Sequence, residues 1–357
     1  MNPDFARLLE ADKSDRRDLF AAAAMRLGTT MQNIEKDFWV CWTLDALFNG
    51  LERGGPRLLF KGGTSLSKGF GLIARFSEDI DITVFRDDLG ASASVEDLET
   101  MSGKQRSRRL DAIRTACQVF IHGPLQARLA RLAAELPGTA GALRITPEDD
   151  DPDGQSLLIW YPSIIASGDG YIRPAVKIEA GAKSARDPHA PVTVKPYISD
   201  DLKGFDLTIA SVTTVDPVRT FWDKVMVLHG LRRWFDRRGE LRGGGQRVSR
   251  HYYDIDRLLK VEVGHRAVAD LAMARDCARH DRMFFNRPDI DLATACPGSF
   301  ALLPHDAMLD QLRRDYAAMQ VMIFGEVPTF DAVMDSVAHL EATVNGDACR
   351  TERAKER

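Results

Sequence analysis

The sequence predicts an α/β (α+β) fold in which a mixed β-sheet core lies between helical segments. Apolar residues recur at helical spacing near both ends of the chain. Between those ends, short apolar or alternating runs bounded by Gly and Pro are typical of strands. We expect N-terminal helices at residues 1–50, the core at 51–215 with a helical insertion at about 103–136, a C-terminal helical domain at 216–344, and a frayed tail at 345–357.

The composition describes a chain that can bury a sizeable core. It has 357 residues, 44% of them hydrophobic, and its net charge of −4 excludes a globally basic nucleic-acid-binding protein but not a local basic patch. Five cysteines without a C-x-x-C pair indicate reduced thiols rather than disulfides or zinc ligands. The charged N-terminus is not that of a signal peptide, and no apolar run approaches ~18 residues, so we expect a cytoplasmic protein without a membrane span.

The helical segments have recognisable ends. The run DLFAAAAMRLG is predicted to end at Gly28, and a second helix with an aromatic core face is expected from about Thr30 to Phe48. In the insertion, Pro124 should break the helical pattern into two helices, since proline lacks the N–H that a helix interior uses.

The stretch from Leu58 to Phe85, LLFKGGTSLSKGFGLIARFSEDIDITVF, organises the core. It predicts a strand ending at Lys61, then a turn at Gly62 and Gly63, whose missing Cβ atoms let the backbone approach a ligand closely. Thr64 and Ser65 are expected to cap a helix whose first N–H groups favour a phosphate. Lys68, one helical turn further on, can either reach that phosphate or lie in solvent.

A second strand, from Asp79 to Phe85, carries two carboxylates. Side chains alternate along a strand, so Asp79 and Asp81 project to one side while Ile80 and Ile82 face the core. Two adjacent carboxylates repel each other unless a cation lies between them, and oxygen ligands suit Mg²⁺ or Mn²⁺. An isolated D-x-D is more often a solvated edge or an ion pair. Together with a phosphate-binding turn, however, it is what nucleotidyl transfer requires.

These motifs also resemble those of a known family. KGGTSLSK followed by RFSEDIDI resembles the signature of the AbiEii/AbiGii-type nucleotidyltransferase toxins, including the MenT group, in the polymerase-β-like nucleotidyltransferase superfamily. IEKDFWVCWTLDALF resembles the family's N-terminal helix and is read as a marker of the fold. The resemblance implies a polymerase-β-like core and a third carboxylate on a neighbouring strand. Glu179, in KIEAGAKS, is the expected third metal ligand, and the alternative is a surface residue of an amphipathic strand.

Two later segments resemble further motifs of the family. DPVRTFWDKVMVLHG resembles a helix whose lysine, here Lys224, contacts the triphosphate, with Asp216 at the acidic start. SRHYYDIDRLL resembles the R-D-x-Y-D-[LI] motif, with His251 where an Asp is usual. Asp254 is expected to orient Lys224 or to act as a base on the attacking hydroxyl. The alternative is a helix cap or a salt bridge with an arginine.

Two basic stretches are candidates for RNA phosphate contact, although each can equally be a solvated face. One opens the helical insertion and the other lies between residues 232 and 250, where seven arginines stand. The residues singled out are Arg108, Arg109, Arg237, Arg238 and Arg242.

The sequence therefore indicates a Mg²⁺- or Mn²⁺-dependent transferase that moves a nucleoside monophosphate from an NTP to an acceptor and releases pyrophosphate. The resemblance implies a tRNA 3′ end as acceptor, a role as a toxin or phage-defence effector, and a separately encoded antitoxin. Three alternatives stay open: transfer to a small molecule such as an antibiotic, transfer to a protein hydroxyl, and a nucleotide- or RNA-binding module without turnover.

Overall fold

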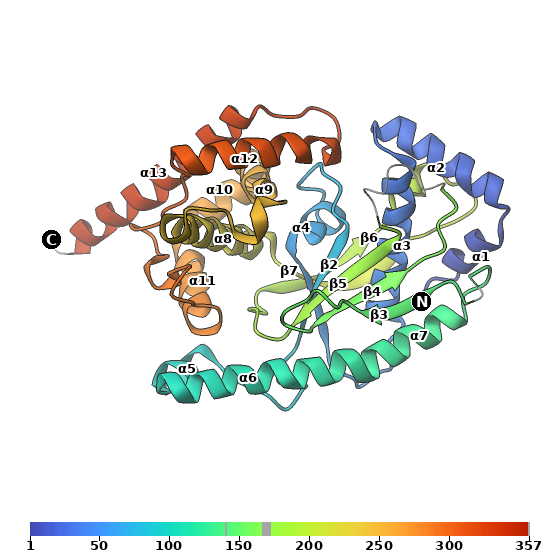
Figure 1. Cartoon of the computed structure of the whole chain (residues 1–357), viewed down its shortest axis with the longest axis horizontal. Helices are drawn as coiled ribbons and strands as arrows, with labels where there is room; N and C mark the ends of the chain where they lie inside the picture. Colours follow the sequence, from blue (N-terminus) through green and yellow to red (C-terminus); the bar gives the residue numbers. More distant parts are fainter. Residues whose placement is uncertain (140, 166–172, 356–357) are drawn as a thin grey trace. The chain divides into compact units, whose positions relative to one another are not determined.

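The computed structural model describes residues 1–139, 141–165 and 173–355 of the chain (Figure 1). The chain divides into two compact units. The first comprises residues 1–71, 75–94 and 101–215, and the second comprises residues 72–74, 95–100 and 216–357. Each unit is described by itself.

The first unit begins with three helices: α1 (Asp4–Glu10), α2 (Lys13–Leu27) and α3 (Met31–Asn49). Helix α2 ends at Gly28, which adopts the left-handed conformation that glycine tolerates best. Helix α3 is capped by Thr30, whose side chain accepts a hydrogen bond from the Asn33 N–H. Both predicted helices before residue 50 are thus confirmed.

One mixed sheet forms the centre of the first unit. Within the described residues it has seven strands in the order β3-β4-β5-β2-β1-β7-β6 (Figure 1). Strands β1/β7 and β2/β5 pair in parallel and the other neighbours are antiparallel. This confirms the predicted α/β class, with helices at both ends of the chain. The strands are β1 (Leu58–Lys61), β2 (Asp79–Val84), β3 (Arg144–Pro147), β4 (Ser156–Trp160), β5 (Ala175–Gly181), β6 (His189–Val194) and β7 (Ile209–Val215).

Along the central strands, side chains alternate between a buried apolar face and a polar face, as their sequences predict. Ile80, Ile82 and Ile178 are fully buried on the face that packs against α3, which contacts β2, β5 and β7. Removing these apolar side chains from water stabilises the sheet against the helix, by roughly 1.5–3 kcal/mol for each fully buried side chain. The opposite face of β2 and β5 carries polar side chains at the intervening positions.

The helical insertion does not break at Pro124, so that prediction is wrong. Helix α6 (Gly103–Phe120), the π-helical turn η2 (Ile121–Leu125) and α7 (Gln126–Ala134) follow one another without interruption and form one long, curved rod in Figure 1. Pro124 lies inside the π-helical turn, a local widening of the helix of the kind that accompanies bends. This unit also contains the short helix η3 (Tyr197–Asp200), and the helical turns in the loop after β1 are described with the site below.

The second unit is helical. Its first long helix, α8, begins at Pro217, and the Asp216 side chain caps it by accepting a hydrogen bond from the Val218 N–H at 2.8 Å. Its described helices are α5 (Val95–Thr100), α8 (Pro217–Arg238), η4 (Arg242–Gly245), α9 (Ser249–Leu259), α10 (Glu262–Ala269), α11 (Leu271–Phe284), η5 (Leu292–Thr294), α12 (Asp306–Met319), η6 (Gln320–Met322) and α13 (Phe330–Lys355).

Two further expectations can be compared with the structure. In the part of the chain that is described, Cys41, Cys117, Cys277 and Cys296 are free thiols. None of the helices described is both long and apolar enough to cross a lipid bilayer.

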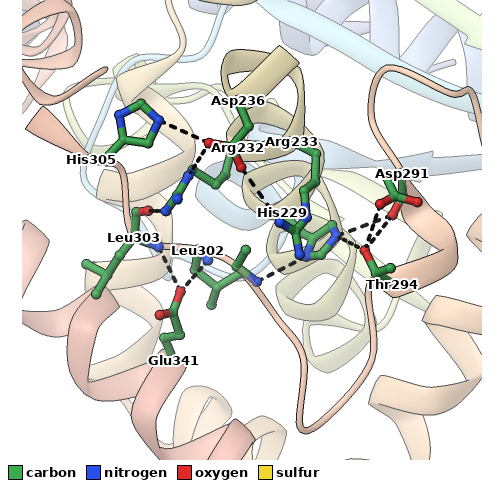
Figure 2. A network of polar contacts seen from close by, with 11 residues as sticks. His229, Arg232, Arg233, Asp236, Asp291, Thr294, Leu302, Leu303, His305 and Glu341 are labelled. Carbon is green, nitrogen blue, oxygen red and sulfur yellow. Dashed lines mark hydrogen bonds and ion pairs between the residues drawn. The ribbon is translucent and has the colours of Figure 1, made fainter. Parts of the chain in front are cut away.

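A buried histidine links α8 to the loop between α11 and α12 (Figure 2). His229 Nδ1 accepts a hydrogen bond from the Ala301 N–H at 3.1 Å, so the ring proton is on Nε2. Nε2 lies 3.1 Å from the Thr294 hydroxyl and 3.4 Å from the Asp291 carbonyl oxygen. Burial, together with the positive charge of Arg233, lowers the pKa of His229 to about 4. The imidazole is therefore neutral at pH 7.

Neighbouring contacts hold the same loop. Arg232 contacts Asp236 at 2.8 Å and donates to the Leu303 carbonyl oxygen, while His305 lies 3.0 Å from the same carboxylate. Glu341 accepts hydrogen bonds from the backbone N–H groups of Leu302 and Leu303. Figure 2 shows how these contacts surround the loop from both sides.

We predict that acid destabilises the second unit through His229. The unfolded histidine titrates near 6.5 and the folded one near 4, so the unfolded state binds more protons between these values. The free energy of unfolding is therefore unaffected by His229 above about pH 6.5. As the pH falls toward 4, protonation of the unfolded histidine lowers that free energy by about 3 kcal/mol. Urea unfolding at a series of pH values measures it.

The matched control is His229→Gln, because the amide can accept from Ala301 and donate to Thr294 but cannot titrate. The free energy of unfolding of the wild type, relative to this variant, should fall between pH 6.5 and 4. If the free energies of unfolding of the two proteins changed in parallel with pH, acid would not act through His229.

Candidate active site

The two aspartates of the D-x-D motif lie on one face of β2. Asp79 and Asp81 are half-buried, whereas Ile80 and Ile82 between and beyond them are buried on the other face. The alternation predicted from the sequence is therefore present, and it holds both carboxylates on a strand in the middle of the sheet.

The strand pairing brings further expected residues into the same row. Asp81 stands opposite Lys61 of β1 on one side and opposite Glu179 of β5 on the other. Residues that are directly opposite in neighbouring strands share a face of the sheet. Lys61, Asp81 and Glu179 thus form one polar row across three strands. Asp79 forms the next row with Lys177.

Lys177 neutralises part of this acidic face. Its Nζ lies 2.8 Å from Glu179 Oε1. Partial burial lowers the pKa of Lys177, but its hydrogen bond to Glu179 and the charges of Glu179, Asp79 and Glu148 outweigh this, so the pKa is raised. The lysine therefore stays positively charged among these carboxylates.

The glycine turn lies directly against Asp81. Gly62 has φ +79°, in the left-handed region, and a Cβ at this position would lie 2.0 Å from Asp81 Oδ2 and 3.0 Å from Asp81 Cβ. At Gly63, a Cβ would lie 2.5 Å from Nη2 of the buried Arg75. The contact at Gly62 extends to the Cβ of a predicted metal ligand, whereas the contact at Gly63 is with the end of the Arg75 side chain.

The helix after the turn begins earlier than expected. Helix α4 (Gly62–Thr64) and the π-helical turn η1 (Ser65–Gly69) start at Gly62, so the predicted capping role of Thr64 and Ser65 is wrong. Their buried hydroxyls bind the protein instead. Thr64 donates to the Asp79 carbonyl oxygen and Ser65 donates to the Gly62 carbonyl oxygen at 2.8 Å. Thr64 thereby fixes the turn to the carboxylate strand.

Lys68 is also turned toward the protein. Its Nζ lies 2.8 Å from Asp37 Oδ1 and 3.6 Å from the centre of the Tyr197 ring, and the side chains of Lys68 and Asp37 are each 3% exposed. Burial lowers the pKa of Lys68, but the charge of Asp37 outweighs it, so the pKa is raised and the ammonium stays charged. The structure thus gives Lys68 a buried ion pair in place of the expected phosphate contact.

The sequence analysis missed the function of the charged segment on α3. Glu35 accepts hydrogen bonds from the Ser163 hydroxyl and the Ile164 N–H, and Lys36 contacts Glu78, the residue before Asp79, at 2.5 Å. Together with Asp37, these buried charges fix the elements that surround the carboxylates. The available signal was three consecutive charged residues beside the aromatic core face of a helix, where buried charges are rare unless paired.

Lys224 and Asp254 form a buried ion pair within the second unit. Lys224 Nζ lies 2.7 Å from Asp254 Oδ2, and the two side chains are 7% and 0% exposed. Asp254 is thus in direct contact with Lys224. Asp216 is the cap of α8.

The candidate RNA-binding arginines have different surroundings. Arg108 and Arg237 are exposed, and Arg109 donates to the Ser92 carbonyl oxygen. Arg238 forms an ion pair with Asp289 at 2.7 Å, and both Arg238 and Arg242 lie over the Trp234 ring, at 5.5 and 5.8 Å from its centre. These last two present guanidinium groups beside an aromatic ring.

The donor set fits a divalent cation. Asp79, Asp81 and Glu179 carry carboxylate oxygens, the ligand type that Mg²⁺ prefers, on one face of two adjacent strands. In the conformation described, no group of three or more His, Cys, Asp or Glu side chains is already gathered as a metal site within residues 1–139, 141–165 and 173–355. Glu179 instead contacts Lys177.

Comparisons with known proteins give the family and the fold of this chain. The family model described as "Nucleotidyl transferase AbiEii toxin, Type IV TA system" matches residues 45–336. The sequence matches none of the curated proteins with which it was compared. Among solved structures, the nucleotidyltransferase toxin MenT4 from Mycobacterium tuberculosis H37Rv is similar in fold, with a TM-score of 0.50 and 15% identity over 92% of this chain and 89% of that one.

We predict that Gly62→Ala destabilises the protein more than Gly71→Ala. Both glycines have positive φ, +79° and +63°, so each substitution strains the backbone by about 1 kcal/mol. Only at residue 62 does the new Cβ overlap another side chain, which should add roughly 1–3 kcal/mol because Asp81 Cβ cannot rotate away. Chemical denaturation measures the difference. Equal losses would show that the turn does not lie against Asp81.

We also predict that Lys68→Met lowers the free energy of unfolding by about 3–5 kcal/mol, since it leaves the Asp37 carboxylate buried without its cation. The matched control is Lys195→Met, in an exposed pair with Asp200 at 2.7 Å, where the loss should stay below about 1 kcal/mol. Urea unfolding compares the two. A small loss at residue 68 would favour a solvent- or substrate-facing lysine.

Proposed function

Because the chain belongs to the AbiEii family of nucleotidyltransferase toxins of type IV toxin–antitoxin systems, we propose that it transfers a nucleoside monophosphate from an NTP to an RNA hydroxyl and releases pyrophosphate. The observation that carries the proposal is the row of Asp81 and Glu179 on adjacent parallel strands, with Asp79 beside it and Gly62 against it. A pure binding module has no need of three carboxylates on one face.

The carboxylates are proposed to hold Mg²⁺ or Mn²⁺ through Asp79, Asp81 and Glu179. When bound, the metal supplies positive charge that polarises the phosphoryl group and offsets the negative charge that develops during transfer. The Gly62–Gly63 turn is proposed to help to place the triphosphate, because its close packing against Asp81 and Arg75 holds the turn beside the carboxylate strand. Lys61, at the end of β1, is proposed to contribute a further positive charge beside Asp81.

Lys224 is proposed to bind the β- or γ-phosphate. A lysine ammonium is a compact point charge suited to phosphate, and the 2.7 Å contact with Asp254 holds it in one position. Asp254 is then a positioning residue rather than the base.

The acceptor is proposed to be RNA, and specifically a tRNA 3′ end. Arg238 and Arg242 beside Trp234, and the exposed Arg237 and Arg108, supply cationic groups with an aromatic ring, a combination that suits an RNA backbone and its bases. Such a reaction would act in the cytoplasm, and a separately encoded antitoxin would restrain it. A role in defence against phage follows from the same proposal.

The test uses the full chain, Mg²⁺, each α-³²P-labelled NTP in turn and total tRNA. We expect label to move to tRNA with the wild type and to fall about a thousandfold with Asp79→Asn/Asp81→Asn, which removes the metal-binding charges while preserving side-chain size. Asp200→Asn, at an exposed carboxylate, is the matched control and should leave transfer unchanged.

The position of the label separates the alternatives. Label on the protein would favour a protein acceptor, and label on an added small molecule alone would favour an antibiotic-type enzyme. NTP binding without transfer to any acceptor would favour the non-catalytic module. Full transfer by the double variant would overturn the proposed metal ligands.

A further inference from the structure

A lysine lies among the proposed metal ligands. Lys177 is two residues before Glu179 on β5, so both side chains project from the same face of the strand. The parallel pairing places Lys177 opposite Asp79 and Glu179 opposite Asp81. The positive charge of Lys177 thus lies on the same face of the sheet as the three carboxylates.

The ammonium is directed along the strand to Glu179. Nζ lies 2.8 Å from Glu179 Oε1, and the two side chains are 28% and 41% exposed. The charges of Asp79, Glu148 and Asp151 also act on Lys177. The lysine therefore adopts a position among acids, although its length would let it extend into water.

This contact has a physical reason. Like charges directly opposite one another on neighbouring strands are destabilising, and Asp81 and Glu179 form such a pair. Lys177 offsets that repulsion when no divalent cation is present. Its contact with Glu179 is partly exposed, and ion pairs of this kind are weak, so a doubly charged ion can displace it.

We propose that Lys177 is an internal counter-ion that competes with the divalent cation for Glu179. Asp79 and Asp81 bind the metal first, and Glu179 joins only when the ammonium leaves it. Lys177 is thus a positioning residue that sets the metal affinity and determines when the third carboxylate is engaged. This inference rests on the proposed function, because it takes the three carboxylates to be the metal ligands.

The experiment measures Mn²⁺ binding to the full chain by the loss of the free Mn²⁺ signal in electron paramagnetic resonance. Lys177→Met should bind Mn²⁺ about tenfold more tightly than the wild type, since a nearby positive charge has been removed. Lys177→Arg keeps the charge and should resemble the wild type. Lys177→Gln provides a second neutral variant with a more polar side chain and should bind like Lys177→Met.

A double-mutant cycle tests whether Lys177 and the metal ion compete at Glu179 itself. In a Glu179→Gln background the gain from Lys177→Met should fall below about twofold, because the contested carboxylate is absent. A gain that persists in this background would overturn competition at Glu179. Lys195→Met, a surface lysine of the same unit, is the matched control and should not change Mn²⁺ affinity.

The outcomes separate this inference from the proposed function. If Asp79→Asn/Asp81→Asn abolishes Mn²⁺ binding while Lys177→Met leaves the affinity unchanged or weaker, the metal site stands and the counter-ion proposal is overturned. If Mn²⁺ binds equally well to Asp79→Asn/Asp81→Asn, the metal site itself is wrong and both proposals fall. Tighter binding by both neutral Lys177 variants, dependent on Glu179, supports the inference.

Discussion

Three carboxylates on one face of two adjacent strands repel one another, and the first unit is built to contain that repulsion. Lys61 and Lys177 stand opposite Asp81 and Asp79 in the sheet, so each aspartate has a cationic residue across from it. The face beneath is closed by buried isoleucines packed on α3. A sheet of this kind holds negative charges at fixed positions, which is a requirement for binding a cation in a defined geometry.

Helix α3 does more than cover the sheet. Its three consecutive charged residues reach three separate segments: the loop at Ser163, the residue before Asp79, and Lys68 after the glycine turn. Buried ion pairs contribute little net stability compared with apolar packing, but breaking one leaves a costly unpaired charge. The charges on α3 therefore favour one arrangement of these segments over alternatives that would leave a charge buried alone.

Local patterns predicted much of the fold and part of the site. Alternation correctly placed Asp79 and Asp81 on one face, and the pattern around Gly28 and Thr30 correctly gave the ends of two helices. The sequence could not give the register that sets Glu179 opposite Asp81, because that pairing joins strands about a hundred residues apart. Nor could it show that Lys68 turns inward, since its partner lies on a helix before the sheet.

The contact between the glycine turn and the carboxylate strand limits how this chain can vary. Every residue other than glycine adds at least a Cβ, and at position 62 that atom would overlap Asp81 while the backbone conformation also disfavours it. Position 62 consequently has no conservative substitute, and a single missense change there is enough to disturb the carboxylate strand. The codon for residue 62 is therefore one at which a missense change acts on the packing of the turn without truncating the chain.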